Sequence, residues 1–310
     1  SAGVDGPAGF GGICMPWSRF HEVMRIWRRL VALPLMSAVN GQVSKMDRAS
    51  HLRSNQATLD QMWAKAKIVH FSDGRLAVSA EATELHFLSA AQIEALIKSG
   101  EFKAGEKYFL GLDVFDSEPY FAWNSDHPKS QSDDAPAGYA TLREIGGDLD
   151  EMQMELALHT VALSNWHKTH PHCARCGAPT SVAMGGAVRT CDADKSEHYP
   201  RTDCAVIVLV RDADDRILLG RQAVWPVGRF SSFAGFLEPG ETFEQCVSRE
   251  VFEESGVSVS KINYLGSQPW PFPASIMISF EALIDDPAAA RPDGAEIVEV
   301  RWYSRAHLRT

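Results

Sequence analysis

The segment 235–257 constrains the fold of this 310-residue chain more than any other part. Glycines near its start allow a tight loop, and a helix is expected to begin near Thr242. On that helix Glu250, Glu253 and Glu254 occupy positions i, i+3 and i+4, so they share one face. Three carboxylates so close together repel one another and raise one another's pKa values unless a cation lies among them.

The ligands of such a cation would be oxygen atoms only. An oxygen-only set favours Mg²⁺ or Mn²⁺, which also bind diphosphate oxygens and can hold a nucleophilic water. Arg249 can neutralise and orient a carboxylate, while Val247, Val251 and Phe252 supply the apolar side of the helix. A solvated acidic helix is the alternative interpretation, but it explains neither the glycines nor the arginine. We therefore expect a divalent-metal site that acts on a diphosphate.

The same segment matches the Nudix signature G-x5-E-x7-R-E-U-x-E-E-x-G-U at every specified position. On these residues the chain resembles the Nudix hydrolases, which cleave diphosphates linked to a nucleoside or another moiety. The resemblance implies that Glu250, Glu253 and Glu254 are metal ligands. It also implies that turnover depends most on Glu254. Arg249 and Glu241 would support the loop and the helix.

A second motif, SQPWPFPAS, follows at Ser267–Ser275. Its three prolines in five positions predict an extended, rigid wall, and Trp270 and Phe272 offer aromatic faces to a flat heterocycle. A proline-rich surface loop is the alternative. The motif resembles the hallmark of the NADH pyrophosphatase branch of the Nudix family. By that resemblance the substrate-binding residues here are Gln268, Pro269, Trp270, Pro271, Phe272, Pro273, Ala274 and Ser275.

The resemblance to this branch assigns roles to five more residues. Tyr199 and Phe236 match aromatic positions that line the base-binding pocket, although core packing would also explain them. Ala234 matches a position whose backbone contacts the metal or the substrate. Arg143 matches a substrate-contacting arginine, with a surface salt bridge as the alternative. Glu296 matches a further metal ligand from outside the helix, with a surface strand carboxylate as the alternative.

Three of the six cysteines lie close together in the sequence. Cys173 and Cys176 form a C-x2-C knuckle, and Cys191 adds a third sulfur from a second hairpin. A zinc ribbon would place a fourth cysteine shortly after Cys191, but none follows there. A closed site has no open position for water, so we expect a structural Zn²⁺, or else hairpins held by packing alone. The candidates for the fourth ligand are Asp194, His172 and His198.

The expected fold class is α+β, with an N-terminal α+β domain, a zinc-ribbon insert and a C-terminal Nudix α/β/α sandwich that has a mixed sheet. The Nudix domain is expected to be truncated, because the family's closing helix would follow residue 310. The predicted boundaries are a leader or disordered segment at 1–40, the N-terminal domain at 41–146, a connecting helix at 147–170, the ribbon at 171–200 and the Nudix domain at 201–310.

Composition excludes some functions. The net charge of −10 argues against a protein that coats polyanions, and no apolar run is long enough to cross a membrane. Residues 15–36 are basic and amphipathic, which fits either an organellar transit peptide or a leader without a role. We expect a cytoplasmic protein. A peroxisomal or mitochondrial location is the alternative in a eukaryote.

The resemblance implies a homodimer that holds two or three Mg²⁺ or Mn²⁺ ions per site and hydrolyses NADH or NAD to AMP and nicotinamide mononucleotide. Removal of NAD caps from RNA 5′ ends by the same chemistry is the alternative. The acidic net charge argues against extensive RNA contact, although a local basic rim of Arg175, Arg189 and Arg201 would suffice. A nucleotide-binding sensor without turnover is a third interpretation, which the complete set of carboxylates disfavours.

Overall fold

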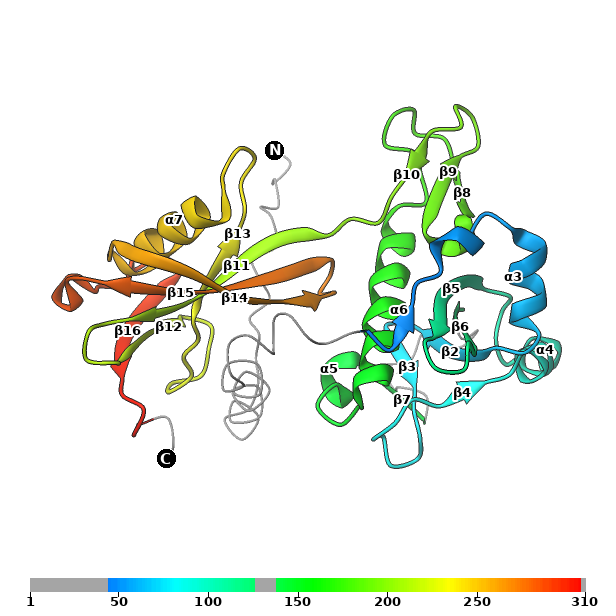
Figure 1. The fold of residues 1–310 in the computed structure, drawn as a ribbon, viewed down its shortest axis with the longest axis horizontal. Helices are drawn as coiled ribbons and strands as arrows, with labels where there is room; N and C mark the ends of the chain where they lie inside the picture. The colour runs from blue at the N-terminus through cyan, green and yellow to red at the C-terminus, as the bar shows by residue number, and fades with distance from the viewer. Residues whose placement is uncertain (1–43, 126–137, 308–310) are drawn as a thin grey trace, which may run out of the picture. The chain divides into compact units, whose positions relative to one another are not determined.

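The computed structural model describes residues 44–125 and 138–307, which form two compact units (Figure 1). The first unit spans the described part of Val43–Thr202 and also contains Trp270–Ala274. The second spans Asp203–Pro269 and the described part of Ser275–Thr310. The predicted leader at 1–40 lies outside the described residues.

A seven-stranded sheet forms the centre of the first unit, in the order β1-β5-β6-β2-β3-β7, with β4 paired to β2. Strands β2 and β6 run parallel, and the other pairs are antiparallel. The strands are β1 (Met46–Asp47), β2 (Lys67–Ser72), β3 (Arg75–Ala77), β4 (Phe87–Leu88), β5 (Glu106–Asp113), β6 (Pro119–Asn124) and β7 (Tyr139–Ala140).

Both faces of this sheet are buried, because neighbouring residues of β2 enter different cores. Ile68 packs with Trp63 of one helix layer, whereas Val69 packs with Leu156 of the other. The turn between β2 and β3 uses Asp73 and Gly74, both with positive φ, as a two-residue hairpin turn requires. The helices of this unit are α3 (Gln56–Trp63), α4 (Ala90–Ser99), α5 (Leu142–Ile145) and α6 (Glu151–Thr169), with the short 3₁₀ helices η1 (Ser50–Leu52) and η2 (Met184–Gly186).

Helix α6 lies within the predicted connecting helix at 147–170, and its Leu156, Leu163 and Trp166 are buried. Asp150 caps its N-terminus by accepting a hydrogen bond from the backbone N–H of Gln153. The helix therefore begins after a cap that the periodicity alone does not locate.

The ribbon is a three-stranded antiparallel sheet of β8 (Thr180–Ala183), β9 (Val188–Cys191) and β10 (Glu197–His198). Arg189 on β9 is buried, and its guanidinium donates to Thr180 Oγ1 at 2.8 Å and contacts His167 Nδ1 at 2.9 Å. It also pairs with Glu106 on β5 at 3.3 Å. The expectation that Arg189 forms part of a basic surface rim is therefore wrong, because its charge is used inside this unit.

The second unit is built on a six-stranded mixed sheet in the order β14-β15-β11-β12-β16, with β13 paired to β11. Strands β11 and β15 are parallel, while β11 is antiparallel to both β12 and β13. One α-helix, α7 (Phe243–Ser255), lies in the described part of this unit, and its buried Val247 and Val251 pack on Val206 and Phe233 of the sheet. The expectation that Phe252 also lies on the apolar side is wrong, because its ring is 52% exposed. The strands are β11 (Asp203–Arg211), β12 (Ile217–Gln222), β13 (Phe233–Phe236), β14 (Val259–Trp270), β15 (Ser275–Ile284) and β16 (Ile297–Tyr303), with the 3₁₀ helix η3 (Pro287–Ala289).

The proline-rich motif is only partly extended. Ser267–Trp270 form the end of β14, as predicted, but Pro271–Ala274 form the turn that leads into β15. The predicted extended wall is therefore wrong for its second half, which is a hairpin tip. The α+β fold class is confirmed, with a mixed sheet in the second unit. Among the described residues, no helix is long and apolar enough to cross a membrane.

Candidate functional site

The carboxylate helix begins and ends where the sequence predicts. Thr242 caps its N-terminus and forms a capping box with Gln245, in which each side chain bonds the other's backbone N–H. Gly256 ends it in the left-handed conformation at φ 68°, which glycine adopts at little cost. This frame fixes the direction of every carboxylate on α7.

Arg249 joins the loop before α7 to the helix. Its guanidinium donates to the two carboxylate oxygens of Glu241 at 2.6 and 2.8 Å and to the carbonyl oxygen of Phe236 at 3.0 Å. The hydrogen bonds from Arg249 lower the pKa of Glu241 to about 2. Arg249 also donates to Glu250 at 2.8 Å and Glu253 at 3.1 Å. The supporting role predicted for Arg249 and Glu241 matches these contacts.

Glu254 is the most deeply buried acid of the site, with 7% of its surface exposed. The backbone of Ala234 is hydrogen-bonded to its carboxylate, but Oε2 has no partner among the residues that the structure describes. Burial, followed by the nearby charges of Glu296 and Glu250, raises the pKa of Glu254 to about 9. A buried, unpartnered carboxylate oxygen that faces other carboxylates is an arrangement that a bound cation would stabilise.

Glu250 lies directly against the backbone of β13. A Cβ atom at Gly235 would stand 1.8 Å from the Glu250 carboxyl carbon, so only glycine leaves room for this carboxylate. Burial raises the pKa of Glu250, and the charges of Glu253 and Glu296 raise it further. Gly235 is therefore needed for two reasons: it allows the tight loop, and it leaves space for the carboxylate of Glu250.

Glu296 stands just before β16, is exposed, and accepts a hydrogen bond from Gln222 Nε2 at 2.9 Å. The structure therefore brings Glu296 from outside the helix towards Glu250 and Glu254, whose pKa values its charge raises. Glu253 is more exposed, at 58% of its side chain, and its carboxylate contacts Arg249. Carboxylate oxygens are the ligands that a hard divalent cation prefers.

The proline-rich tip, residues 270–274, contacts α5 and α6 within the first unit. The Arg143 guanidinium lies 4.1 Å from the ring centre of Phe272 and 5.7 Å from that of Trp270, and these two rings meet edge to face at 5.0 Å. The side-chain amide of Asn165 donates to the carbonyl oxygens of Pro271 at 3.0 Å and Pro273 at 3.2 Å. Sequence reasoning missed Asn165, because a polar residue on a helix gives no signal of a contact 106 residues away.

The remaining predicted pocket residues are divided between the two units. Tyr199 is in the first unit, whereas Ala234, Phe236, Gln268, Pro269 and Ser275 are in the second. Tyr199 and Phe236 are 64% and 40% exposed, so core packing does not explain these two aromatic rings.

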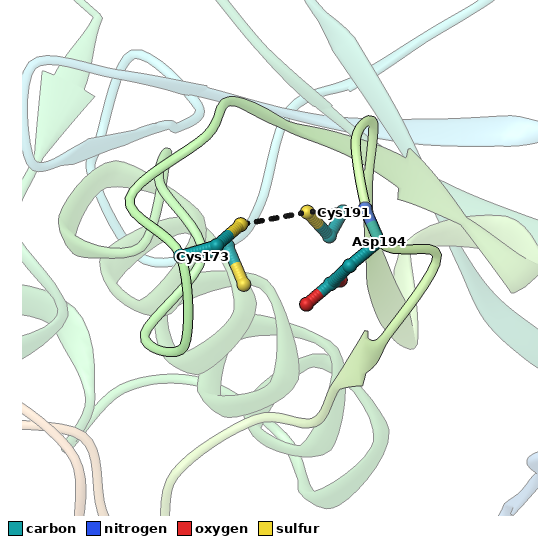
Figure 2. Close-up of side chains that lie close together, drawn as sticks. Cys173, Cys191 and Asp194 are labelled. Carbon is teal, nitrogen blue, oxygen red and sulfur yellow. Dashed lines mark hydrogen bonds between the residues drawn. The ribbon is translucent and has the colours of Figure 1, made fainter.

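Three cysteines and one aspartate gather on the ribbon (Figure 2). The ligand atoms of Cys173, Cys176, Cys191 and Asp194 all lie within 4.8 Å of one another. The sulfurs of Cys176 and Cys191 are 3.5 Å apart, and tetrahedral Zn–S bonds of about 2.3 Å would separate two sulfurs by about 3.8 Å. The donor set therefore fits a zinc ion.

Of the three candidates for the fourth ligand, Asp194 is the one in this group. Its carboxylate accepts hydrogen bonds from the backbone N–H and the hydroxyl of Ser196 at 2.9 and 2.5 Å. His198 Nε2 approaches one sulfur, that of Cys173, at 3.2 Å. His172 forms a backbone bridge with Pro179 and is not one of the four.

Comparison with known proteins agrees with this arrangement. Residues 201–310 match the Nudix domain, and residues 168–199 match the NADH pyrophosphatase zinc ribbon domain. The chain is 36% identical over 281 residues to the NAD-capped RNA hydrolase NudC of Mycobacterium bovis, with 91% of this chain and 86% of that protein covered. The protein of the same name from Stutzerimonas stutzeri is 37% identical over 193 residues, with 62% of this chain and 68% of that protein covered. A crystal structure of a Nudix hydrolase from Nitrosomonas europaea covers 44% of this chain and 78% of its own, at 25% identity and a TM-score of 0.38.

The chain therefore belongs to the Nudix hydrolase family, in the group whose Nudix domain follows an NADH pyrophosphatase zinc ribbon. It is a hydrolase, and family membership implies the use of a divalent metal. The cysteine cluster on the ribbon can hold zinc.

Proposed function

We propose that this hydrolase cleaves the diphosphate bond of NADH and NAD in the presence of Mg²⁺ or Mn²⁺, giving AMP and nicotinamide mononucleotide. The observation that carries this proposal is the group of acids around the unpartnered, buried oxygen of Glu254. The names of the relatives, which refer to NAD-capped RNA, support NAD as the nucleotide.

The carboxylates of Glu250, Glu254 and Glu296, with Glu253 at the exposed edge, would hold the metal. A divalent cation there would offset the negative charge that develops on the phosphoryl oxygens. By resemblance to the family, Glu254 would position or deprotonate the water that attacks phosphorus in line. Arg249 contacts Glu241 and the carbonyl oxygen of Phe236. These contacts hold the segment before α7, which includes the backbone of Ala234, in place.

The residues proposed to contact the substrate include aromatic rings and one cation. Trp270 and Phe272 of the first unit would stack on a heterocycle of the dinucleotide. By resemblance to the family, Tyr199 and Phe236, whose rings are exposed, are further candidates for such stacking. The guanidinium of Arg143 has no carboxylate partner among the described residues, so it is available to a phosphate group. Gln268, Pro269, Pro271, Pro273, Ala274 and Ser275 complete the set by resemblance to the family.

The test is product analysis with purified protein, NADH or NAD, and added Mg²⁺ or Mn²⁺. AMP and nicotinamide mononucleotide should appear only with metal, and Glu254→Gln should abolish their release. Glu244→Gln is the matched control, because Glu244 is exposed on the same helix and outside the group. Calorimetric binding of NADH without release of AMP would contradict the proposal and would indicate a sensor.

A second candidate function is removal of NAD caps from RNA, which the names of the relatives favour. The same bond is cleaved, so the site chemistry is unchanged. Arg175 and Arg201 remain as exposed candidates for RNA contacts, whereas Arg189 is buried. Rates on free NADH and on NAD-capped RNA, measured side by side with one protein sample, would rank the two substrates.

We also propose that Cys173, Cys176, Cys191 and Asp194 together hold one structural Zn²⁺. Metal analysis of protein purified without chelator should give about one zinc per chain. A folded protein without zinc would contradict this.

By resemblance to the family we propose a homodimer, which light scattering of the purified chain tests. A cytoplasmic location stays a prediction, with the peroxisome or mitochondrion as the alternative in a eukaryote.

A further inference from the structure

The tip of the β14–β15 hairpin is held to helix α6 by one side chain. Asn165 Nδ2 donates to the carbonyl oxygens of Pro271 and Pro273, at 3.0 and 3.2 Å. These two carbonyls flank Phe272, so the two hydrogens of a single amide fix the backbone on both sides of one aromatic residue. Asn165 is half-buried, and its hydrogen bond to Pro271 is partly shielded from water, whereas the hydrogen bond to Pro273 is exposed.

The chemistry of the tip explains why it needs an outside donor. Pro271 and Pro273 have no backbone N–H, so they cannot donate hydrogen bonds that would stabilise a turn. The N–H of Phe272 is already used, since it donates to the carbonyl oxygen of Trp270 at 2.7 Å. A primary amide carries two N–H groups on one nitrogen and can satisfy two nearby carbonyls at once. An aspartate of the same shape would present only lone pairs to both carbonyls.

The ring of Phe272 extends from the backbone that Asn165 fixes. It packs partly against the core of the first unit, and the Arg143 guanidinium lies 4.1 Å from its centre. The ring of Trp270 meets it edge to face at 5.0 Å. A shift of the tip backbone would therefore move both aromatic rings and the cation that stacks on them.

We propose that Asn165 is a positioning residue that sets the orientation of Trp270 and Phe272 for substrate binding. The inference rests on the proposed function, in which these rings stack on the dinucleotide. Asn165 does not touch the diphosphate in this account. It acts through the tip, so its loss weakens substrate binding more than the chemical step.

Steady-state kinetics on NADH test the proposal with three variants. Asn165→Asp should raise KM about tenfold, which is roughly the effect expected from the loss of two hydrogen bonds. The same variant should change kcat by less than about threefold. Asn165→Gln keeps the two donors on a longer side chain and should give a KM between those of the wild type and Asn165→Asp. Lys168→Ala is the control, because Lys168 is exposed on the same helix and should behave as the wild type.

A second measurement does not depend on substrate. Hydrogen exchange of a peptide covering 267–276, in protein without nucleotide, should be faster in Asn165→Asp and unchanged in Lys168→Ala. Unchanged exchange or an unchanged KM in Asn165→Asp would overturn the proposal, as would a lower melting temperature with wild-type kinetics. If the wild type does not hydrolyse NADH, the proposed function fails by itself, while the exchange result still reports whether Asn165 holds the tip.

Discussion

The carboxyl group of Glu250 occupies the space that a side chain on Gly235 would need. The distance of 1.8 Å from a Cβ at 235 to the Glu250 carboxyl carbon leaves no room for both. The substitution Gly235→Ala should therefore displace Glu250 and lower kcat/KM by about 100-fold, a loss typical of one misplaced catalytic contact. Gly266→Ala is the control, because a Cβ there meets nothing within 4 Å. Wild-type activity of Gly235→Ala would show that the position of Glu250 is not critical.

The pKa of Glu254 predicts how stability depends on pH. Burial, then Glu296 and Glu250, raise this pKa from 4.5 to about 9 in the folded chain. A carboxyl that holds its proton more tightly when folded stabilises the fold at low pH, and this contribution is lost as the pH rises from about 4.5 through about 9. Urea unfolding in the presence of EDTA should show the wild-type free energy of unfolding decreasing over this range. The decrease should be smaller in Glu254→Gln, which stays uncharged, and parallel curves for the two proteins would contradict the prediction.

Added metal should reverse that loss. A cation that binds the folded carboxylates, and not the unfolded chain, raises the free energy of unfolding in proportion to the logarithm of its concentration above Kd. At pH 8, Mg²⁺ or Mn²⁺ should therefore raise the melting temperature of the wild type but have little effect on Glu254→Gln. An equal response from both proteins would place the metal elsewhere.

Arg249 should not tolerate replacement by lysine. Its planar guanidinium contacts both Glu241 oxygens and the Phe236 carbonyl, and a single ammonium cannot reproduce this fork. We expect Arg249→Lys to lower kcat/KM by at least about tenfold while the protein stays folded, as checked by kinetics and circular dichroism. Arg301→Lys is a suitable control, since Arg301 is an exposed arginine that pairs with Glu299. Equal kinetics in the two variants would mean that the loop does not depend on Arg249.

The fourth zinc ligand can be tested by substitution at position 194. Asp194→Asn should lower the affinity for zinc, measured by competition with a chelator, by at least about tenfold. Loss of a residue that only supports a metal ligand typically lowers affinity by this factor, and loss of the ligand itself should lower it at least as much. Asp194→Cys should retain zinc more tightly and, with Co²⁺ in its place, should show stronger sulfur-to-metal absorption. A larger loss of zinc in His198→Ala than in Asp194→Asn would identify the histidine as the ligand instead.

Much of the site could be predicted from the sequence because its geometry is local. The Thr242 cap and the spacing of the acids fix α7 and the face on which Glu250 and Glu254 lie. The spacing alone does not predict that Glu253 differs from Glu250 and Glu254. In the structure Glu253 is more exposed and contacts Arg249. That difference depends on which strands cover the helix, and so on tertiary packing.

The contacts that the sequence did not predict join residues far apart in the chain. Gln222 contacts Glu296 because β12 pairs with β16. The sequence of neither strand predicts which strand it pairs with. Only the end of strand β14, within the proline-rich motif, was predicted to be extended, since the residues before it alternate without a clear apolar face. Arg189 was expected at the surface because its partners, among them His167, converge only after folding.

The guanidinium of Arg189 has a practical consequence for dissecting the protein. Three separate elements, β8, α6 and β5, share this one cation through Thr180, His167 and Glu106. A fragment that stops before β9 would remove the cation and leave its partners facing an empty space in the interior. A fragment of the N-terminal part should therefore extend through the ribbon to Thr202 so that this buried cation is kept, and only a chain that also holds Trp270–Ala274 contains the whole first unit.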